Sequence, residues 1–182
     1  MAVKHGLLAI LTLGPAYGLQ LRDELVARAP HRNGINVGQV YGTLERLRKA
    51  GLVVEAGTTL DGLQRYGLTS SGRTAAAEWM RASAQGASLD WSEMLDQVLV
   101  VSSIPDAPID QLIRSYRAAL APASPERAES QPRQRQVADS ATLLLLDAAR
   151  QWIDEAARSL STSAAFELSN ERPRRGRRAT LS

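Results

Sequence analysis

Three polar side chains, spaced three or four residues apart, have the chemistry to bind nucleic acid. Gln39, Thr43 and Arg46 lie in the stretch 36–51, NVGQVYGTLERLRKAG. An amide, a hydroxyl and a guanidinium read base edges in a major groove, and a guanidinium also binds phosphate. At about 100° per residue, all three would share one side of a helix. The stretch is therefore suited to reading DNA if it folds as a helix.

The apolar residues of this stretch predict such a helix over about 36–50. They recur at intervals of three and four residues, the period of one buried face: Val37, Val40, Leu44 and Leu47. Asn36 and Gln39 form a capping-box-like pair at the start. Gly51 predicts the end, with Arg48 and Lys49 in the last turn.

Two glycines lie on the opposite side of this helix. Gly38 and Gly42 are four residues apart, and a glycine inside a helix costs roughly 1 kcal/mol relative to alanine. Together they make a smooth surface that could press into a groove. An ordinary amphipathic helix whose glycines have no role remains an alternative for this stretch taken alone.

The composition excludes several classes of protein. The chain has 182 residues, 44% hydrophobic and 23% charged, with no cysteine and two histidines. We therefore expect no disulfide, no metal site and no cofactor. An apolar run from Leu7 to Leu13 is followed by Gly14-Pro15, which indicates a buried helix and not a signal peptide. No stretch approaches the roughly 20 apolar residues of a membrane span, so we expect a cytoplasmic protein.

The net charge of +3 is unevenly distributed and suggests three regions. Residues 1–83 carry a net +4, residues 84–168 a net −5, and residues 169–182 a net +4. We predict a DNA-binding domain over 1–83, a helical dimerisation and effector region over 84–168, and a disordered basic tail over 169–182. The basic first region is the part expected to meet a polyanion.

The elements before and after the central helix predict a winged helix-turn-helix. Helices are expected over 4–13 and 19–29, ahead of the helix over 36–50. The segment 52–68 contains β-branched residues around an Asp-Gly pair, which predicts a two-stranded wing. A fourth helix is expected over about 70–83, capped by Thr69 or Ser70. The fold class is therefore mainly α, with an N-terminal winged helix and a C-terminal helical region.

The C-terminal half also has helical periodicity. The segment 91–104 could contain a strand at VLVV, but its wider spacing of three and four favours a helix. Asp106 is expected to cap a helix over about 107–121, followed by a polar linker over 122–134. A long helix is predicted over 135–166, with an apolar stripe from Val137 to Leu160. Little else in the chain could cover that stripe, which suggests a second subunit.

Three segments of the chain resemble the PadR-type transcriptional regulators. They are LAILTLGPAYGLQL (8–21), VYGTLERLRKAGLV (40–53) and YGLTSSGR (66–73). The chain departs from the family pattern at Leu19, where an aromatic residue is usual, and at Gly42, where another side chain is usual. The resemblance implies a DNA-binding regulator that responds to small aromatic compounds.

We therefore predict a homodimeric transcriptional repressor that binds double-stranded DNA sequence-specifically and is released from it by a small-molecule effector. Its operator should be a near-palindrome, because a two-fold dimer sets two recognition helices roughly 34 Å apart. Tyr41 and Gly42 should lie at the DNA, where Tyr41 either packs in the core with a surface hydroxyl or contacts phosphate. The expected phosphate contacts are Arg32, Arg46, Lys49 and Arg65, and the expected base readers are Gln39, Thr43 and Arg46.

An effector site is expected around Trp91, Tyr116 and Trp152. These aromatics fall on apolar helix faces beside small residues, which can leave a slot for a planar ligand. Plain core or interface packing is the alternative for all three. A winged helix that binds only proteins is the alternative function. An enzyme is not expected, because the sequence shows no set of nucleophile, base and orienting residue.

Overall fold

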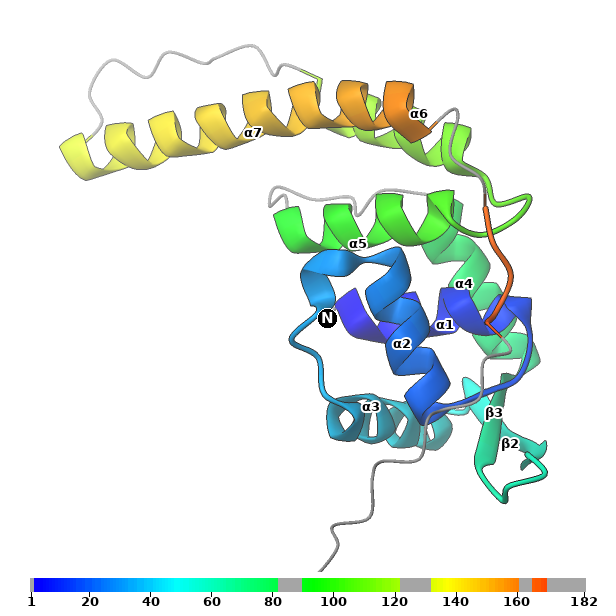
Figure 1. The fold of residues 1–182 in the computed structure, drawn as a ribbon. Helices are drawn as coiled ribbons and strands as arrows, with labels where there is room; N and C mark the ends of the chain where they lie inside the picture. The colour runs from blue at the N-terminus through cyan, green and yellow to red at the C-terminus, as the bar shows by residue number, and fades with distance from the viewer. Residues whose placement is uncertain (1, 82–89, 122–131, 161–164, 170–182) are drawn as a thin grey trace, which may run out of the picture.

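Helices stacked in layers, with a small sheet at one end, make up the structure (Figure 1). The computed structural model describes residues 2–81, 90–121, 132–160 and 165–169. The helices are α1 (Ala2–Ile10), α2 (Gly18–Arg28), α3 (Val37–Lys49), α4 (Ser70–Arg81), α5 (Trp91–Ser102), α6 (Ile109–Ala119) and α7 (Arg133–Leu160). The mainly α fold class with a winged helix-turn-helix and a C-terminal helical region is confirmed. None of the described helices is long and apolar enough to cross a membrane.

The first helix, α1, lies at the centre of the N-terminal part. Leu7, Leu8 and Ile10 on its different sides are all fully buried, as expected of a helix without a polar face. A short 3₁₀ turn over Leu11–Leu13 follows it. Gly14, with φ of 146°, then breaks the helical path ahead of Pro15. The helix α1 packs against α2, α3, α4 and α5, so it supports the element that carries the candidate site.

The sheet has three antiparallel strands in the order β1-β3-β2. The strands β2 (Val53–Thr58) and β3 (Gln64–Leu68) form the predicted wing, closed by a turn in which Gly62 has a φ of 77°. The third strand, β1 (Ala16–Tyr17), pairs with β3 through Ala16 opposite Tyr66. The sequence interpretation missed β1 because two residues are too few to show a strand period.

A close contact fixes the wing against α4. Thr69 caps α4, since its Oγ1 accepts a hydrogen bond from the Gly72 N–H at 3.0 Å. A Cβ at Gly72 would lie 1.9 Å from the Leu52 carbonyl oxygen, so only glycine fits there. The start of β2 and the first turn of α4 are thereby held together.

The helix α5 joins two hydrophobic cores, and VLVV lies within it. Val100 packs with the core around α1, whereas Met94 and Val98 pack with α6 and α7. The helical interpretation of 91–104 is therefore confirmed. The division at residues 83 and 84 stays a prediction, because α5 contacts both sides of it.

The prediction that Asp106 caps the next helix is wrong. The helix α6 begins at Ile109 after Pro108, and no side chain caps it. Asp106 has a φ of 56°, a left-handed conformation that belongs to the turn between α5 and α6. The helix therefore begins directly after Pro108, two residues later than expected.

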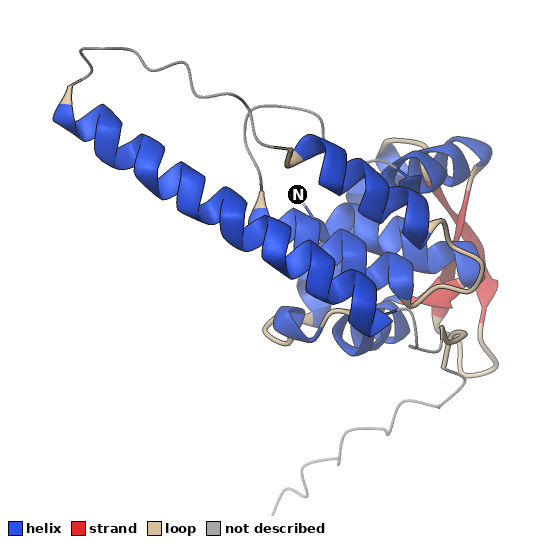
Figure 2. Cartoon of the chain, turned by 90° about the horizontal axis from the view of Figure 1, so that it is seen from above, coloured by secondary structure: helices blue, strands red, loops and turns tan. Residues whose placement is uncertain are grey.

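The long helix is shorter at its C-terminal end than predicted. The helix α7 ends at Leu160, and residues 165–169 are extended and not helical. The N-terminal half of α7 projects beyond the body of the molecule (Figure 2). The tail was predicted to be disordered over 169–182, but Ser169 is ordered by hydrogen bonds to Gln20 and Glu24, and residues 170–182 lie outside the described residues.

Candidate nucleic-acid interface

The capping box predicted at the start of α3 is present. The Gln39 N–H donates to Asn36 Oδ1 at 2.9 Å, and the Asn36 N–H donates to Gln39 Oε1 at 3.1 Å. Both bonds fix where α3 begins. They also engage the side-chain oxygen of Gln39, so the amide N–H groups are the part of this side chain left to meet a base acceptor.

The buried face of α3 is narrower than the sequence predicted. Val40, Leu44 and Leu47 are buried against the core, whereas Val37 is 39% exposed. The prediction that Val37 lies in the buried stripe is therefore wrong, because the stripe meets the core only from Val40 onward. The first turn of α3 consequently presents an apolar side chain on the surface.

Arg46 lies along the outer face of α3. Its Nε donates to the Gly42 carbonyl oxygen at 3.1 Å, and its terminal nitrogen donates to Thr43 Oγ1 at 3.0 Å. Thr43 is only 6% exposed, and its hydroxyl donates to the Gln39 backbone carbonyl oxygen at 2.8 Å. The structure therefore places Thr43 beneath Arg46, as its support, while Arg46 and Gln39 lie at the surface.

The glycines of α3 leave this face open. A Cβ added at Gly42 would meet no atom of the described part of the chain within 4 Å. At Gly38 the added atom would meet the Asn36 side-chain oxygen at 3.2 Å. Packing within the described part of the chain therefore does not require glycine at position 42. A ligand that approaches this face of α3 closely would require it.

Tyr41 connects α3 with the start of α2. Its ring lies so close to Gly18 that an added Cβ there would come within 2.5 Å of the ring. Tyr41 is 39% exposed, so part of it remains accessible at the surface despite the contact with Gly18. The sequence interpretation did not single out Gly18, although its place in the Gly-Pro-Ala-Tyr-Gly turn was visible.

Two more tyrosines lie close to Tyr41. The pKa of Tyr17 is raised mainly by burial and, to a smaller extent, by the neighbouring Asp23. The pKa of Tyr66 is likewise raised mainly by burial and, to a smaller extent, by Tyr41. Both phenols therefore stay protonated at neutral pH. Protonated phenols at the corner between α3 and the wing can donate hydrogen bonds to phosphate oxygens.

The last turn of α3 carries cations that a carboxylate already partly neutralises. Arg48 donates to Glu45 at 2.9 Å, and Lys49 lies 3.7 Å from the same carboxylate. The Arg48 guanidinium is the main reason that the pKa of Glu45 is lowered. Lys49 is 72% exposed, so its ammonium is accessible to a phosphate.

Arg32 is held by α5. Its guanidinium donates to both carboxylate oxygens of Asp96 at 2.7–3.1 Å, and His31 Nε2 lies 2.7 Å from the same carboxylate. Asp96 is fully buried and Arg32 is about one quarter exposed. The hydrogen bond to Asp96 raises the pKa of Arg32. This fork ties the turn just before α3 to α5, a link that spacing in the sequence could not reveal.

Arg65 lies on β3 of the wing and holds the turn after α1. Its guanidinium donates to the Pro15 carbonyl oxygen at 2.6 and 3.2 Å. Arg65 pairs with Tyr17 across the sheet. These hydrogen bonds fix the Arg65 guanidinium, and the strand pairing sets Arg65 beside Tyr17. The other N–H groups of the guanidinium can bind a ligand.

A hollow of about 890 Å³ runs beside α3. It is lined by Gln39, Gly42 and Arg46 of α3, by Arg32 from the turn before it, and by Lys4 of α1, which the sequence interpretation had not included. Lys4 and Arg46 give a positive potential beside the reading helix, whereas the charge of Arg32 is largely neutralised by Asp96.

The three aromatics of the expected effector site are in the C-terminal core. Trp91 and Trp152 contact each other at a ring-centroid distance of 5.6 Å. Tyr116 is 3% exposed and donates to Gln97 at 2.5 Å. Burial raises the pKa of Tyr116 well above its usual range. The structure thus brings the two tryptophans together between α5 and α7, with Tyr116 packed in the same core.

Residues 7–78 match the transcriptional regulator PadR-like family. These 72 of the 182 residues are similar to that family. The matched residues run from the second half of α1 to Glu78 in α4, so the PadR-like segment includes every predicted DNA-binding residue.

Solved structures similar to this PadR-like chain are more distant. Bacillus subtilis PadR in complex with operator DNA is 20% identical, with a TM-score of 0.41 over 89% of this chain and 97% of that chain. The same protein in complex with p-coumaric acid is 17% identical, with a TM-score of 0.39 over 89% and 97%. The smu.1604c protein of Streptococcus mutans UA159 is 18% identical, with a TM-score of 0.38 over 88% and 97%. No curated protein matches the chain significantly.

Proposed function

We propose that this PadR-like chain is a homodimeric transcriptional repressor that binds a near-palindromic double-stranded operator through α3. The observation that carries the proposal is the outer face of α3, where Gln39 and Arg46 stand on either side of the open surface at Gly42. A helix with a flat centre and hydrogen-bond donors beside it fits a major groove.

The DNA-facing residues divide into base readers and phosphate binders. Gln39 and Arg46 are assigned to base edges, with Thr43 orienting Arg46 from beneath. Lys49, Arg65 and the Tyr41 hydroxyl are assigned to phosphates. Arg32 is assigned chiefly to positioning α3, because Asp96 already holds its guanidinium.

The homodimer is proposed to form through α7. The apolar residues in the N-terminal half of this helix are exposed in the single chain, and Leu144 is 71% exposed. They form one stripe along α7: Val137, Ala141, Leu144, Leu145 and Ala148. A second copy of α7 would bury this stripe, so replacing Leu144 by Asp should convert a dimer into a monomer in light scattering.

Release by a small aromatic effector is proposed at the Trp91–Trp152 contact. A planar ligand between the two rings would move α7 relative to α5, and the Asp96 fork connects α5 to the turn before α3. Such a ligand lowers DNA affinity only as far as it prefers the geometry that does not bind DNA. Because Bacillus subtilis PadR forms a complex with p-coumaric acid, that phenolic acid is the first compound to try.

Substitutions on α3 and the wing test the DNA-binding proposal. If Arg46 reads a base, replacing it by Ala should cost about 1–3 kcal/mol and relax specificity at one position in each half-site. If Arg65 holds a phosphate, its Ala variant should weaken binding to all sequences equally and lower the slope of log K against log salt by about 0.9. The titrations use selected and scrambled duplexes, with Lys variants as charge-preserving controls.

The outcome separates DNA binding from the alternative function. A winged helix that binds only proteins would show no salt-dependent binding to either duplex. Unchanged affinity in both the Arg46 and Arg65 variants would remove the proposed docking of α3 and the wing.

A further inference from the structure

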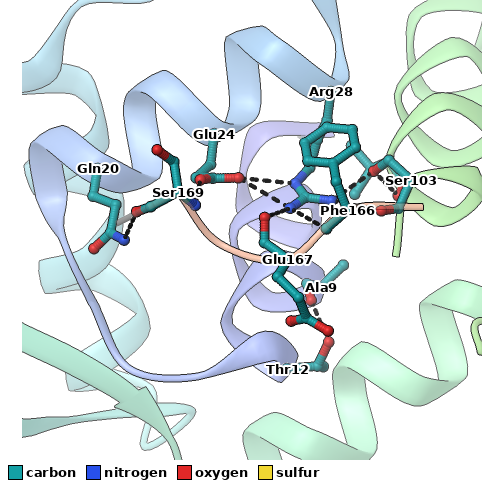
Figure 3. A network of polar contacts seen from close by, with 10 residues as sticks. Ala9, Thr12, Gln20, Glu24, Arg28, Ser103, Phe166, Glu167 and Ser169 are labelled. Carbon is teal, nitrogen blue, oxygen red and sulfur yellow. Dashed lines mark hydrogen bonds and ion pairs between the residues drawn. The ribbon is translucent and has the colours of Figure 1, made fainter. Parts of the chain in front are cut away.

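A short extended segment that follows α7 packs along α2, and we call residues 165–169 the strap. Figure 3 shows the strap crossing beside Glu24 and Arg28. The Phe166 N–H donates to the Ser103 carbonyl oxygen at 3.0 Å, and the Phe166 carbonyl oxygen accepts from Arg28 at 2.9 Å. The Arg28 guanidinium also lies 4.1 Å from the centre of the Phe166 ring. The strap is therefore bound through its backbone and through a side chain.

The buried guanidinium of Arg28 explains why an extended backbone lies there. The Arg28 side chain is fully buried, and a buried guanidinium needs a counter-charge and acceptors for its N–H groups. Glu24 supplies the charge at 3.0 Å, and Ser103 accepts through its carbonyl and hydroxyl oxygens at 2.8 and 2.9 Å. The carbonyl oxygens of Phe166 and Glu167 accept from the same group at 2.9 and 3.3 Å. Without the strap, this buried cation would lose two of its acceptors, at a cost in free energy.

The other end of the strap is held by α2 as well. Leu168 packs against the hydrophobic core around α1. The Ser169 N–H donates to Glu24 at 2.5 Å, and the Ser169 carbonyl oxygen accepts from the Gln20 amide at 2.8 Å. The contacts of the strap thus run from Arg28 back to Gln20, about two turns of α2.

Through the strap, the chain returns to the DNA-binding part in which it began. The helices α1, α2 and α3 and the wing share one hydrophobic core, and α5 joins this core to the second core with α6 and α7. Four residues separate the end of α7 at Leu160 from Ala165, and five residue steps span at most roughly 18 Å. The C-terminal helices are therefore attached to the DNA-binding part at two places, through α5 and through the strap. Two attachments resist a rotation that one alone would permit.

This double attachment matters for a dimer that reads two half-sites. In the proposed dimer, the C-terminal helices join the two chains, and each α3 reads one half-site. The spacing of the two reading helices then depends on the angle between the DNA-binding part and the C-terminal helices.

We propose that the strap, seated on Arg28, fixes this angle and thereby selects the distance between half-sites that the dimer accepts. Arg28 and Phe166 are then positioning residues for operator spacing and not DNA contacts. The inference rests on the proposed function, because it needs a dimer and an operator with two half-sites.

The test compares operators that differ only in spacing. The centre of the selected palindrome is shortened or lengthened by one or two base pairs, and a duplex with a single half-site completes the set. Each base pair moves the half-sites by about 3.4 Å and rotates one relative to the other by about 35°. A dimer with a fixed angle cannot follow such a change, whereas a dimer with a loosened angle can.

Four full-length proteins are titrated against each duplex. They are the natural chain, the double variant Phe166→Ala/Leu168→Ala, Arg28→Lys, and Phe166→Tyr. The double variant removes the two side chains that pack the strap against the DNA-binding part. Arg28→Lys keeps a cation beside Glu24 but places its donors on a single nitrogen. Phe166→Tyr, the matched control, keeps a ring over the guanidinium. Circular dichroism and light scattering establish that each variant is folded and dimeric.

We expect the natural chain to bind the altered operators roughly 5- to 150-fold more weakly than the selected one, the loss of one base interaction. In the double variant this ratio should fall about fivefold, the lower end of typical coupling between two sites, because C-terminal helices attached only through α5 can turn. Arg28→Lys should change the ratio in the same direction, and Phe166→Tyr should keep it. Binding to the single half-site should be the same for all four proteins, since the outer face of α3 is unchanged.

An unchanged spacing preference in the folded, dimeric double variant would overturn the inference and leave operator binding by α3 intact. Equal weakening on every duplex, the single half-site included, would also overturn it, because the strap would then only support the fold of the DNA-binding part. If the double variant does not fold, Phe166→Ala alone and Arg28→Lys decide by the same comparison. Failure of the natural chain to bind any duplex would overturn the proposed function, and this inference with it.

Discussion

Substitutions at Gly42 should change the stability of α3 and its DNA binding in different ways, so they test the proposed docking of α3 directly. In a helix interior, Gly is less favourable than Ala by about 0.8–1.0 kcal/mol. The added Cβ meets no described atom within 4 Å, so no clash opposes this gain. We expect Gly42→Ala to raise the free energy of unfolding by up to about 1 kcal/mol.

A larger side chain at the same position should harm only DNA binding. Gly42→Leu would project an isobutyl group from the centre of the open face and hold the helix away from the groove. Each base interaction is worth about 1–3 kcal/mol, and about 1.4 kcal/mol is a tenfold change. Loss of the Arg46–base interaction alone should therefore weaken operator binding by roughly 5- to 150-fold.

Urea denaturation and fluorescence-anisotropy titration measure the two effects separately. Glu78→Leu, at an exposed position of α4, is the matched control and should leave operator binding unchanged. If Gly42→Leu folds and binds the operator as tightly as the natural chain, α3 does not dock through this face. If Gly42→Ala is less stable than the natural chain, the reasoning about the open space is wrong.

Three further predictions concern stability. Asp96→Asn weakens the fork to Arg32 and should cost about 1.5–3 kcal/mol in urea denaturation while lowering DNA affinity, although Asp96 lies on α5. Gly72→Ala places a Cβ 1.9 Å from the Leu52 carbonyl oxygen and should lower the thermal midpoint by several degrees. Burial lowers the pKa of His5, so the unfolded chain takes up this proton first as the pH falls. Stability should therefore drop below about pH 6.5, and His5→Gln should reduce that drop in urea titrations at about pH 7.5 and 5.5.

The sequence was most informative where structure depends on neighbouring residues. The limits of α3 and its capping box follow from Asn36, Gln39 and Gly51, which act within one or two helical turns. The wing followed from its β-branched residues and the Asp61-Gly62 turn. These local signals also placed Arg46 on the outer face of α3, where the structure has it.

The sequence was least informative where interactions join distant residues. Arg32 and Asp96 are 64 positions apart, and Arg28 contacts Phe166 across 138 positions, so no periodicity could pair them. Thr43 has the right spacing for the outer face, but Arg46 covers it. Ala165 and Phe166 were predicted as helix because they continue a long helical stripe, whereas in the structure they are not helical and the Phe166 and Glu167 carbonyl oxygens accept from Arg28.

The central claim is that a dimer reads DNA sequence through two copies of α3. The most direct measurement is selection of bound duplexes from a random-sequence pool by the natural chain, followed by sequencing. We expect one enriched near-palindrome, with half-sites whose centres are about 10 base pairs or a multiple of that apart. Recovered duplexes with no enriched sequence, or with a single half-site and no symmetry, would contradict it.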